Sequence, residues 1–246
     1  MVAKTHGIIQ YWDSHIGYKR SDAVKKIAKF LAGLTNTSVI RRVLSYSILK
    51  TEFKSLGDVE VFKHREEIWD NALSQLDQKA VTYIEFGVFK GESISYFSKN
   101  NLHSNSIFIG LDSFEGLSEA WAGNEVGYFS TDGAIPESSD ERVKFNKGLF
   151  IDSWPSLYTS LLNKTNFLVH FDADLYSSTI YALTKMDLLQ QEYLAVFDEF
   201  LADEVRALSD YLVSYGAKVQ FLAMQKWRGY PQVVLCRITP HILSTT

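Results

Sequence analysis

Cysteine is almost absent from this chain of 246 residues: its one cysteine, Cys236, lies in the apolar run "QVVLC". A single thiol excludes a disulfide within the chain and a cysteine-rich zinc site. Because free cysteines are usually buried and inert, we expect Cys236 to be a core residue of a late strand. The fold must then be stabilised by an apolar core, for which the hydrophobic content of 46% is sufficient.

Long apolar stretches and clusters of basic residues are also missing. No uncharged run reaches the ~20 residues that cross a membrane, and the start, "MVAKTHGIIQYWDSH", has no apolar signal core. We therefore expect no membrane span and a cytoplasmic protein. The net charge is −4, and no basic stripe is present that would neutralise phosphates, so we expect no nucleic-acid partner.

Residues 1–76 have the pattern of helices. The segments 21–34, 38–50 and 62–76 place apolar residues at helical spacing. No Pro- or Gly-rich linker separates this region from the one that follows. The sequence therefore predicts a helical layer or lid that packs on a core domain formed by residues 77–246.

From Val81 onwards, short β-rich runs alternate with helical segments. The strands that we expect are 81–87, 106–112, 147–152, 167–174, 193–200, 217–225 and 231–238. Such alternation predicts parallel crossover units, and hence an α/β fold of the Rossmann-like, doubly wound class with a mostly parallel seven-stranded sheet. The last two runs are joined without a helix, which predicts an antiparallel last strand in a hairpin at one edge.

A long polar connection, residues 121–141, follows the second expected strand. Connections of this length in compact domains are usually either functional or disordered. Ligands of doubly wound sheets bind at the carboxyl ends of the strands, and this connection begins near such an end. We therefore expect residues 121–141 to form a substrate lid.

A glycine-containing turn, "EFGVFKGES", follows the first expected strand. Gly87 and Gly91 allow close approach of the backbone to a ligand, and the next helix opens with free N–H groups. The spacing is not that of the dinucleotide fingerprint, which disfavours NAD and FAD. Asp112 ends the second strand, where an acid can accept hydrogen bonds from ribose hydroxyls or simply form a turn. Together the two elements favour a nucleoside-bearing ligand.

Carboxylates end the fourth and fifth expected strands, in "HFDADLYSST" and "FDEF". In an extended chain Asp172 and Asp174 point the same way, and neighbouring strands are ~5 Å apart, so Asp198 and Glu199 can converge with them. Crowded carboxylates suit a divalent cation, and oxygen ligands without thiolate suit Mg²⁺, Mn²⁺ or Ca²⁺. The alternative is that these residues, or the serines that follow, only cap the next helix.

Taken in order, "IEFGVFKGES", "GLDSFEGL", "KGLFIDSWP", "FDADLYSST" and "FDEF" resemble the macrocin O-methyltransferase family, whose members methylate sugar hydroxyls on antibiotics. The resemblance covers residues 81–200. It implies S-adenosylmethionine in the cleft, a magnesium ion, a small sugar-containing acceptor and, in many members, a homodimer. The acceptor could be a nucleotide sugar, a polysaccharide unit or a glycosylated natural product.

The resemblance also implies roles for individual residues. Asp172, Asp198 and Glu199 would hold the metal, although the family more often has Asp at the position of Glu199. Asp174 would be the general base. The residues implied for binding S-adenosylmethionine are Glu85, Phe86, Gly87, Gly91, Ser93, Asp112, Ser113 and Asp152.

Two other functions remain open from the sequence. In a nucleotide-sugar glycosyltransferase, a D-x-D pair such as Asp172 and Asp174 binds Mn²⁺ and a diphosphate. The glycine turn and Asp112 argue against it, because they indicate a nucleoside cleft at the first strand. The second alternative is a nucleoside-binding module that has kept the fold without turnover.

Overall fold

The computed structural model describes residues 26, 29, 30, 33, 37–77, 79–201 and 203–241. The chain divides into two compact units, Met1–Arg42 and Val43–Thr246. The first helix expected from the sequence, 21–34, lies mostly outside the described residues. The second and third are confirmed as α3 and α4, and the part of α3 after Arg42 and all of α4 belong to the same unit as the sheet.

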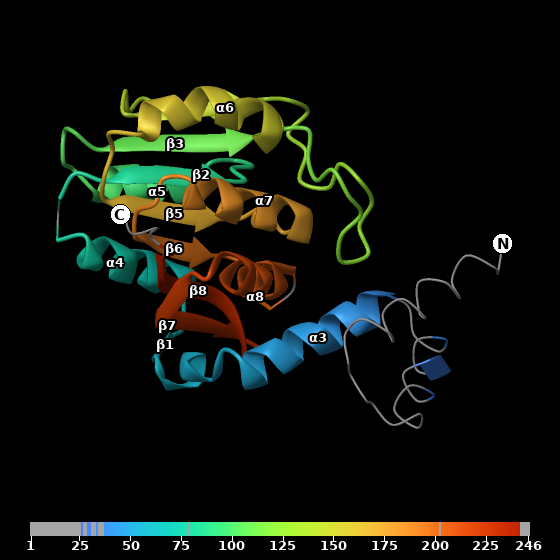
Figure 1. Cartoon of the computed structure of the whole chain (residues 1–246). Coiled ribbons are helices and arrows are strands. Elements are labelled where there is room, and N and C mark those ends of the chain that lie inside the picture. The colour runs from blue at the N-terminus through green and yellow to red at the C-terminus, as the bar shows by residue number, and fades with distance from the viewer. Residues whose placement is uncertain are drawn as a thin grey trace, which may run out of the picture. The chain divides into compact units, whose positions relative to one another are not determined.

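The second unit is a single mixed sheet covered by helices (Figure 1). Its strands are β1 (Glu60–Phe62), β2 (Thr82–Phe86), β3 (Ile107–Asp112), β4 (Val143–Lys147), β5 (Phe167–Phe171), β6 (Tyr193–Phe197), β7 (Lys218–Trp227) and β8 (Tyr230–Thr239). The helices are α3 (Thr37–Thr51), the short 3-10 helix η1 (Lys54–Asp58), α4 (Arg65–Gln75), α5 (Glu92–Asn100), α6 (Phe150–Leu161), α7 (Tyr176–Asp187) and α8 (Asp203–Tyr215).

In the described part of the chain the sheet has eight strands, in the order β1-β7-β8-β6-β5-β2-β3-β4. β8 is antiparallel to both of its neighbours, and the other pairs are parallel. The predicted Rossmann-like α/β fold with a mostly parallel sheet and an antiparallel last strand is thus confirmed. The prediction of seven strands was one short, since β1 pairs with β7 and forms the edge beyond the predicted hairpin.

One predicted strand was misplaced. The segment 147–152 was expected to be the third strand, but the strand is β4 (Val143–Lys147) and the apolar residues after it begin α6. β4 is an edge strand with half-exposed, partly charged residues, so it lacks a strong apolar signal. Phe150, Trp154 and Leu157 have helical spacing and bury one side of α6.

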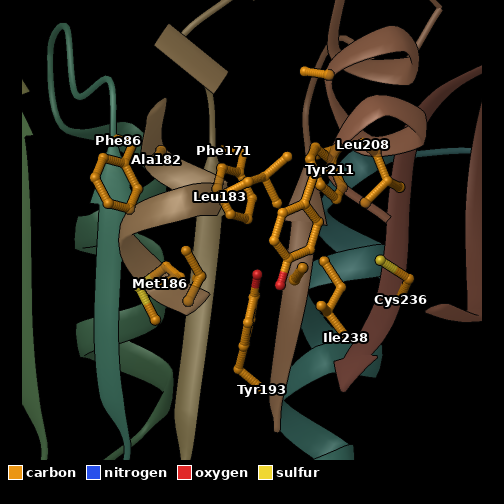
Figure 2. Close-up of a cluster of buried hydrophobic side chains, with 14 of the residues drawn as sticks. Phe86, Phe171, Ala182, Leu183, Met186, Tyr193, Leu208, Tyr211, Cys236 and Ile238 are labelled. Atoms are coloured by element: carbon orange, nitrogen blue, oxygen red, sulfur yellow. The ribbon is translucent and has the colours of Figure 1, made fainter. Parts of the chain in front are cut away.

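The apolar core lies on both faces of the sheet. Helices α6, α7 and α8 cover one face, and α4 and α5 cover the other (Figure 1). Figure 2 shows part of the first face, where Phe86 and Phe171 of the strands pack beside Leu183 of α7. Cys236 is fully buried there, as expected, and burial raises the pKa of its thiol.

No helix in the described part of the chain has both the length and the apolar character that crossing a membrane requires.

Candidate active site

The strand order reverses between β2 and β5, and the candidate site lies at the carboxyl ends of these strands. The chain runs from β2 to β3 and β4 on one side, and then returns to place β5 on the other side of β2. Such a switch point is where doubly wound sheets bind ligands. The Asp172 N–H donates to the Phe86 carbonyl at 2.9 Å, and the Asp198 N–H donates to the Phe171 carbonyl at 3.1 Å. The strand ends therefore bring Gly87, Asp172 and Asp198 side by side.

Gly87 makes this arrangement possible. Its φ of +94° is in the left-handed region, and an added Cβ would lie 1.9 Å from the carbonyl oxygen of Asp172. No other residue type fits that close approach of two backbones. The glycine turn therefore permits β2 and β5 to end against one another.

A cavity of about 390 Å³ opens at these strand ends. Its wall includes many of the residues expected from the sequence to form the site, namely Gly87, Asp112, Ser113, Asp172, Asp174, Asp198 and Glu199. The wall does not include the other expected cofactor-binding residues, namely Glu85, Phe86, Gly91, Ser93 and Asp152. Asp152 lies in the first turn of α6 and not at a strand end.

Asp112 holds the glycine turn in place. Its Oδ2 accepts hydrogen bonds from the N–H groups of Val88 at 2.7 Å and Phe89 at 2.8 Å. Its Oδ1 accepts a hydrogen bond from the Phe114 N–H at 2.7 Å. Asp112 therefore forms the turn that the sequence analysis gave as the alternative to ribose binding. A carboxylate has about four acceptor positions, so Oδ1 can accept one more hydrogen bond. The structural role and a ligand-binding role are therefore compatible.

Asp174 has an unusual backbone conformation. Its φ is +57°, and it follows a strand that ends at Phe171. The extended alternation on which the prediction for Asp172 and Asp174 rested has therefore ended, yet both residues line the cavity. Asp174 is 6% exposed, and burial, with the charges of Glu199 and Asp198, raises its pKa to about 7. A carboxyl group with this pKa is suited to exchange protons at neutral pH.

The capping alternative for this segment was wrong. The N-cap of α7 is Leu175, and it makes no side-chain capping hydrogen bond. The Ser177 hydroxyl instead donates to Glu119 at 2.5 Å, outside the helix. Asp172 and Asp174 therefore do not cap α7, which was the structural role that the sequence left open for them.

The pKa values of other acids at the strand ends are also raised. Burial, together with the charge of Asp198, raises the pKa of Asp172 well above its ordinary value. Burial likewise raises the pKa of Glu199. Sequence reasoning missed a further buried acid, Glu204, whose Oε2 accepts a hydrogen bond from the Glu199 N–H at 3.1 Å. Glu204 lies in the first turn of α8, where an acid has the pattern of an ordinary helix start.

A buried polar cluster lies beneath the cavity. Burial lowers the pKa of His170, but the interaction with the nearby carboxylates of Asp198 and Glu85 more than offsets this and raises it to about 10. Its Nδ1 is 3.5 Å from Glu85 Oε1, and its Nε2 is 3.6 Å from Asp198 Oδ1. The Ser93 hydroxyl donates to Glu85. Glu85 and Ser93 thus support the floor of the site from within the sheet.

Arg65 is a second residue that the sequence did not reveal. It lines the cavity from the start of α4, and its Nη1 lies 3.8 Å from Asp198 Oδ2. Its Nη2 donates to Glu92 Oε2 at 2.5 Å. The region 1–76 carries no recognisable motif, so no local signal marked Arg65.

The connection after β3 reaches the cavity. Gly116, Leu117 and Phe129 are part of the cavity wall, and the Phe129 ring lies 5.4 Å from the Phe89 ring of the glycine turn. The predicted lid, 121–141, thus contributes one wall residue, while its opening and closing stay a prediction.

Within the described residues, no three His, Cys, Asp or Glu side chains lie close enough together to hold a metal ion. The donor chemistry is nevertheless that of a hard cation, with only carboxylate oxygens at the strand ends. Among the described residues, the buried Oδ1 of Asp198 has no hydrogen-bond partner, although it lies 3.6 Å from His170 Nε2.

Comparison with known proteins identifies the fold. No protein-family profile and no curated protein sequence matches the chain. Among solved structures, the calicheamicin methyltransferase CalS11 has 18% identity and a TM-score of 0.50, and the match covers 82% of this chain and 93% of that one. The apo structure of CalS11, described as a TDP-rhamnose 3'-O-methyltransferase, has 18% identity, 82% and 95% coverage and a TM-score of 0.47.

An O-methyltransferase from Bacillus cereus, in complex with SAH, has 14% identity, 95% and 97% coverage and a TM-score of 0.44. The likeness to CalS11 agrees with the strand order in showing that this chain has a Rossmann-like fold of the kind used by methyltransferases.

Proposed function

We propose that this chain is an S-adenosylmethionine-dependent O-methyltransferase that acts on a hydroxyl of a small sugar-containing acceptor and depends on a divalent cation. One observation carries the proposal. The acids Asp172, Asp174, Asp198 and Glu199 lie on the wall of the same cavity as Gly87 and Asp112. A nucleoside-binding half and a proton-accepting half are thus combined in one site.

The cavity suits the cofactor in size and charge. Its volume of about 390 Å³ falls within the roughly 300–1,000 Å³ of small-molecule sites. The acid-lined wall favours a ligand that carries a sulfonium cation. Asp112 would accept a hydrogen bond from the ribose through its unused position on Oδ1. The cofactor, when bound, supplies the methyl group.

The acids at the strand ends suit a divalent cation. Asp172, Asp198 and Glu199 would hold it, after rotation of their side chains toward one another. The raised pKa of Asp172 and the unpartnered Oδ1 of Asp198 support this role, because a cation would relieve both. Bound there, the cation would stabilise the ionised form of the acceptor hydroxyl. Glu199 must also reach the cation. Its side chain is longer than that of the Asp that is more frequent at this position in the macrocin O-methyltransferase family, which the motifs resemble.

Asp174 would take the proton from the acceptor hydroxyl. Burial and the neighbouring acids raise the pKa of Asp174 to about 7, which suits a group that exchanges protons near neutral pH. The remaining task of the chain is to hold the hydroxyl oxygen in line with the methyl group, which is catalysis by positioning.

The acceptor class rests on the resemblance of the strand-end motifs to sugar O-methyltransferases. CalS11, whose structure this chain resembles, is described as a calicheamicin methyltransferase.

The test is methyl transfer from labelled S-adenosylmethionine to a panel of nucleotide sugars and glycosylated natural products. We expect transfer to at least one acceptor, a loss of roughly tenfold or more on treatment with EDTA, and recovery with Mg²⁺. Transfer that is indifferent to chelation would remove the cation from the proposal. Transfer of a glycosyl group in place of a methyl group would replace the function altogether.

A further inference from the structure

Arg65 is the one basic residue among the described residues that line the cavity. The same wall carries the carboxylates of Glu92, Asp112, Asp172, Asp174, Asp198 and Glu199. An anionic group of a ligand would be repelled by this wall, except where a cation compensates for it. Arg65 is therefore the one side chain of the described wall that can attract a carboxylate.

The guanidinium group of Arg65 is held in one orientation. It lies over the ring of Trp69, with 5.0 Å between Cζ and the ring centroid, and the Trp69 side chain is buried. In addition, Nη2 donates to Glu92 Oε2 at 2.5 Å. A planar cation that is stacked and tethered in this way loses little further freedom when it binds a ligand.

Most of the donors of this group are unused. A guanidinium has five N–H donors, and within the described residues Arg65 makes one hydrogen bond, to Glu92. Its Nη1 is 3.8 Å from Asp198 Oδ2, which is an ion pair without hydrogen-bond contact. The Arg65 side chain is 36% exposed, so its free donors are accessible.

We propose that Arg65 binds the carboxylate of the amino-acid part of the cofactor and thereby selects ligands that carry this group. The inference rests on the proposed function. The amino-acid end is favoured over the acceptor because Arg65 is tethered to Glu92, the first residue of α5, directly after the glycine turn. The charges of a zwitterionic amino-acid group also complement the cavity wall. Its ammonium would lie near the acidic side chains, and its carboxylate would bind Arg65.

The test compares two ligands that differ only in this carboxylate. S-adenosylhomocysteine and its decarboxylated analogue are titrated by calorimetry into the wild-type chain and into Arg65→Gln, which removes the charge and keeps the length of the stem. We expect Arg65→Gln to bind S-adenosylhomocysteine roughly 10- to 100-fold more weakly, and to bind the decarboxylated analogue within about twofold of wild type.

Two further variants serve as controls. Arg237 also lies in an exposed ion pair, at 2.9 Å from Glu192, with a side chain that is 34% exposed and remote from the cavity wall. We expect Arg237→Gln to leave both affinities unchanged. Arg65→Lys keeps the charge but loses the planar fork, so we expect an intermediate affinity for S-adenosylhomocysteine.

The outcomes separate the inference from the proposed function. If wild type binds S-adenosylhomocysteine but Arg65→Gln binds it equally well, the inference is overturned and the function stands. Equal weakening of both ligands in Arg65→Gln would likewise overturn the inference, because it would indicate a structural role. If wild type binds neither ligand, the proposed function fails and the inference fails with it.

Discussion

At the scale of the residue, Asp174 combines three features that rarely occur together. It is almost fully buried, its φ of +57° is unusual for a residue other than glycine, and its pKa is raised to about 7. Backbone strain of this kind is retained where surrounding structure fixes it, and it is frequent at functional sites. The strained backbone thus belongs to a residue whose side chain is part of the cavity wall.

Replacement of Asp174 by asparagine is expected to stop methyl transfer while the cofactor still binds. The amide cannot accept a proton, so we expect the rate to fall roughly 10²- to 10⁴-fold, with the affinity for S-adenosylhomocysteine within about twofold of wild type. Asp77→Asn is the matched control, since Asp77 is an exposed aspartate with a φ of 51° that lies outside the cavity wall. Retained transfer by Asp174→Asn would remove Asp174 as the base.

Strand-end residues were the part of the site that could be predicted from the sequence. Asp172 and Asp198 directly follow apolar runs, so their place at one edge of the sheet could be predicted from the topology rules. Arg65 could not be predicted, because it reaches the cavity only through the packing of α4 on the sheet. Glu85 was assigned to the cavity from its place in the motif, but it is fully buried beside His170 and Ser93.

At the scale of the element, the segment between β3 and β4 is fixed to the end of α5 by one side chain. Arg142 Nη1 donates to the Asn101 carbonyl at 2.7 Å, and Nη2 donates to the Ser98 carbonyl at 2.6 Å and to Asp140 Oδ2 at 2.6 Å. These carbonyls lie at the end of a helix, where no intrahelical donor remains for them. A single arginine thus joins the helix end to the edge strand.

We expect Arg142→Met to lower the free energy of unfolding by about 2 kcal/mol, because it leaves carbonyls at the helix end without a donor. Urea denaturation measures this, with Arg237→Met as a control that should change stability by less than about 0.5 kcal/mol. A change as small as that of the control would contradict the role assigned to Arg142.

The interaction between Arg142 and Asp140 also predicts that the effect of Arg142 on stability depends on pH. Hydrogen bonding to Arg142 lowers the pKa of Asp140 below its ordinary value. This contribution is present above the unfolded pKa and is lost as the pH falls through the lower, folded value. The difference in stability between wild type and Arg142→Met should therefore shrink below about pH 4.

Prediction of the elements failed where the apolar signal was weak or ambiguous. β1 has three residues, too few to show a period of two, and it is partly exposed at the edge of the sheet. The start of α6 was assigned to a strand because a short apolar run cannot be distinguished from a buried strand by pattern alone. The buried central strands β2, β5 and β6 were predicted to within a few residues, because their side chains are buried along the whole length.

At the scale of the whole molecule, a concentration of buried acids lies at one edge of the sheet. The pKa values of Asp172, Asp174, Glu199 and Glu204 are all raised, mainly by burial. The folded chain therefore binds protons at these acids more tightly than the unfolded chain does. Such a region weakens the fold as its acids ionise, and a cation compensates for this effect.

The cation-free protein is thus expected to lose stability as the pH rises through the folded pKa of Asp174, about 7. Mg²⁺ at ~100 times its Kd should raise the Tm at pH 8 by roughly 5–10 °C. The increase should be smaller at pH 5.5, where protons compete for the acids. Differential scanning calorimetry measures both effects, with Asp172→Asn as the variant in which the response to Mg²⁺ is lost. A Tm that depends on neither pH nor Mg²⁺ would contradict a cation site at these acids.

The central claim is that the cavity at the β2–β5 switch point binds S-adenosylmethionine. The most direct test is calorimetry in separate titrations. One titration uses S-adenosylhomocysteine, and the others use UDP-sugars and GDP-sugars in its absence. We expect one site per chain for S-adenosylhomocysteine, with micromolar affinity that falls roughly tenfold or more in Asp112→Ala. Binding of a nucleotide sugar but not of S-adenosylhomocysteine would contradict the account and would favour a glycosyltransferase in its place.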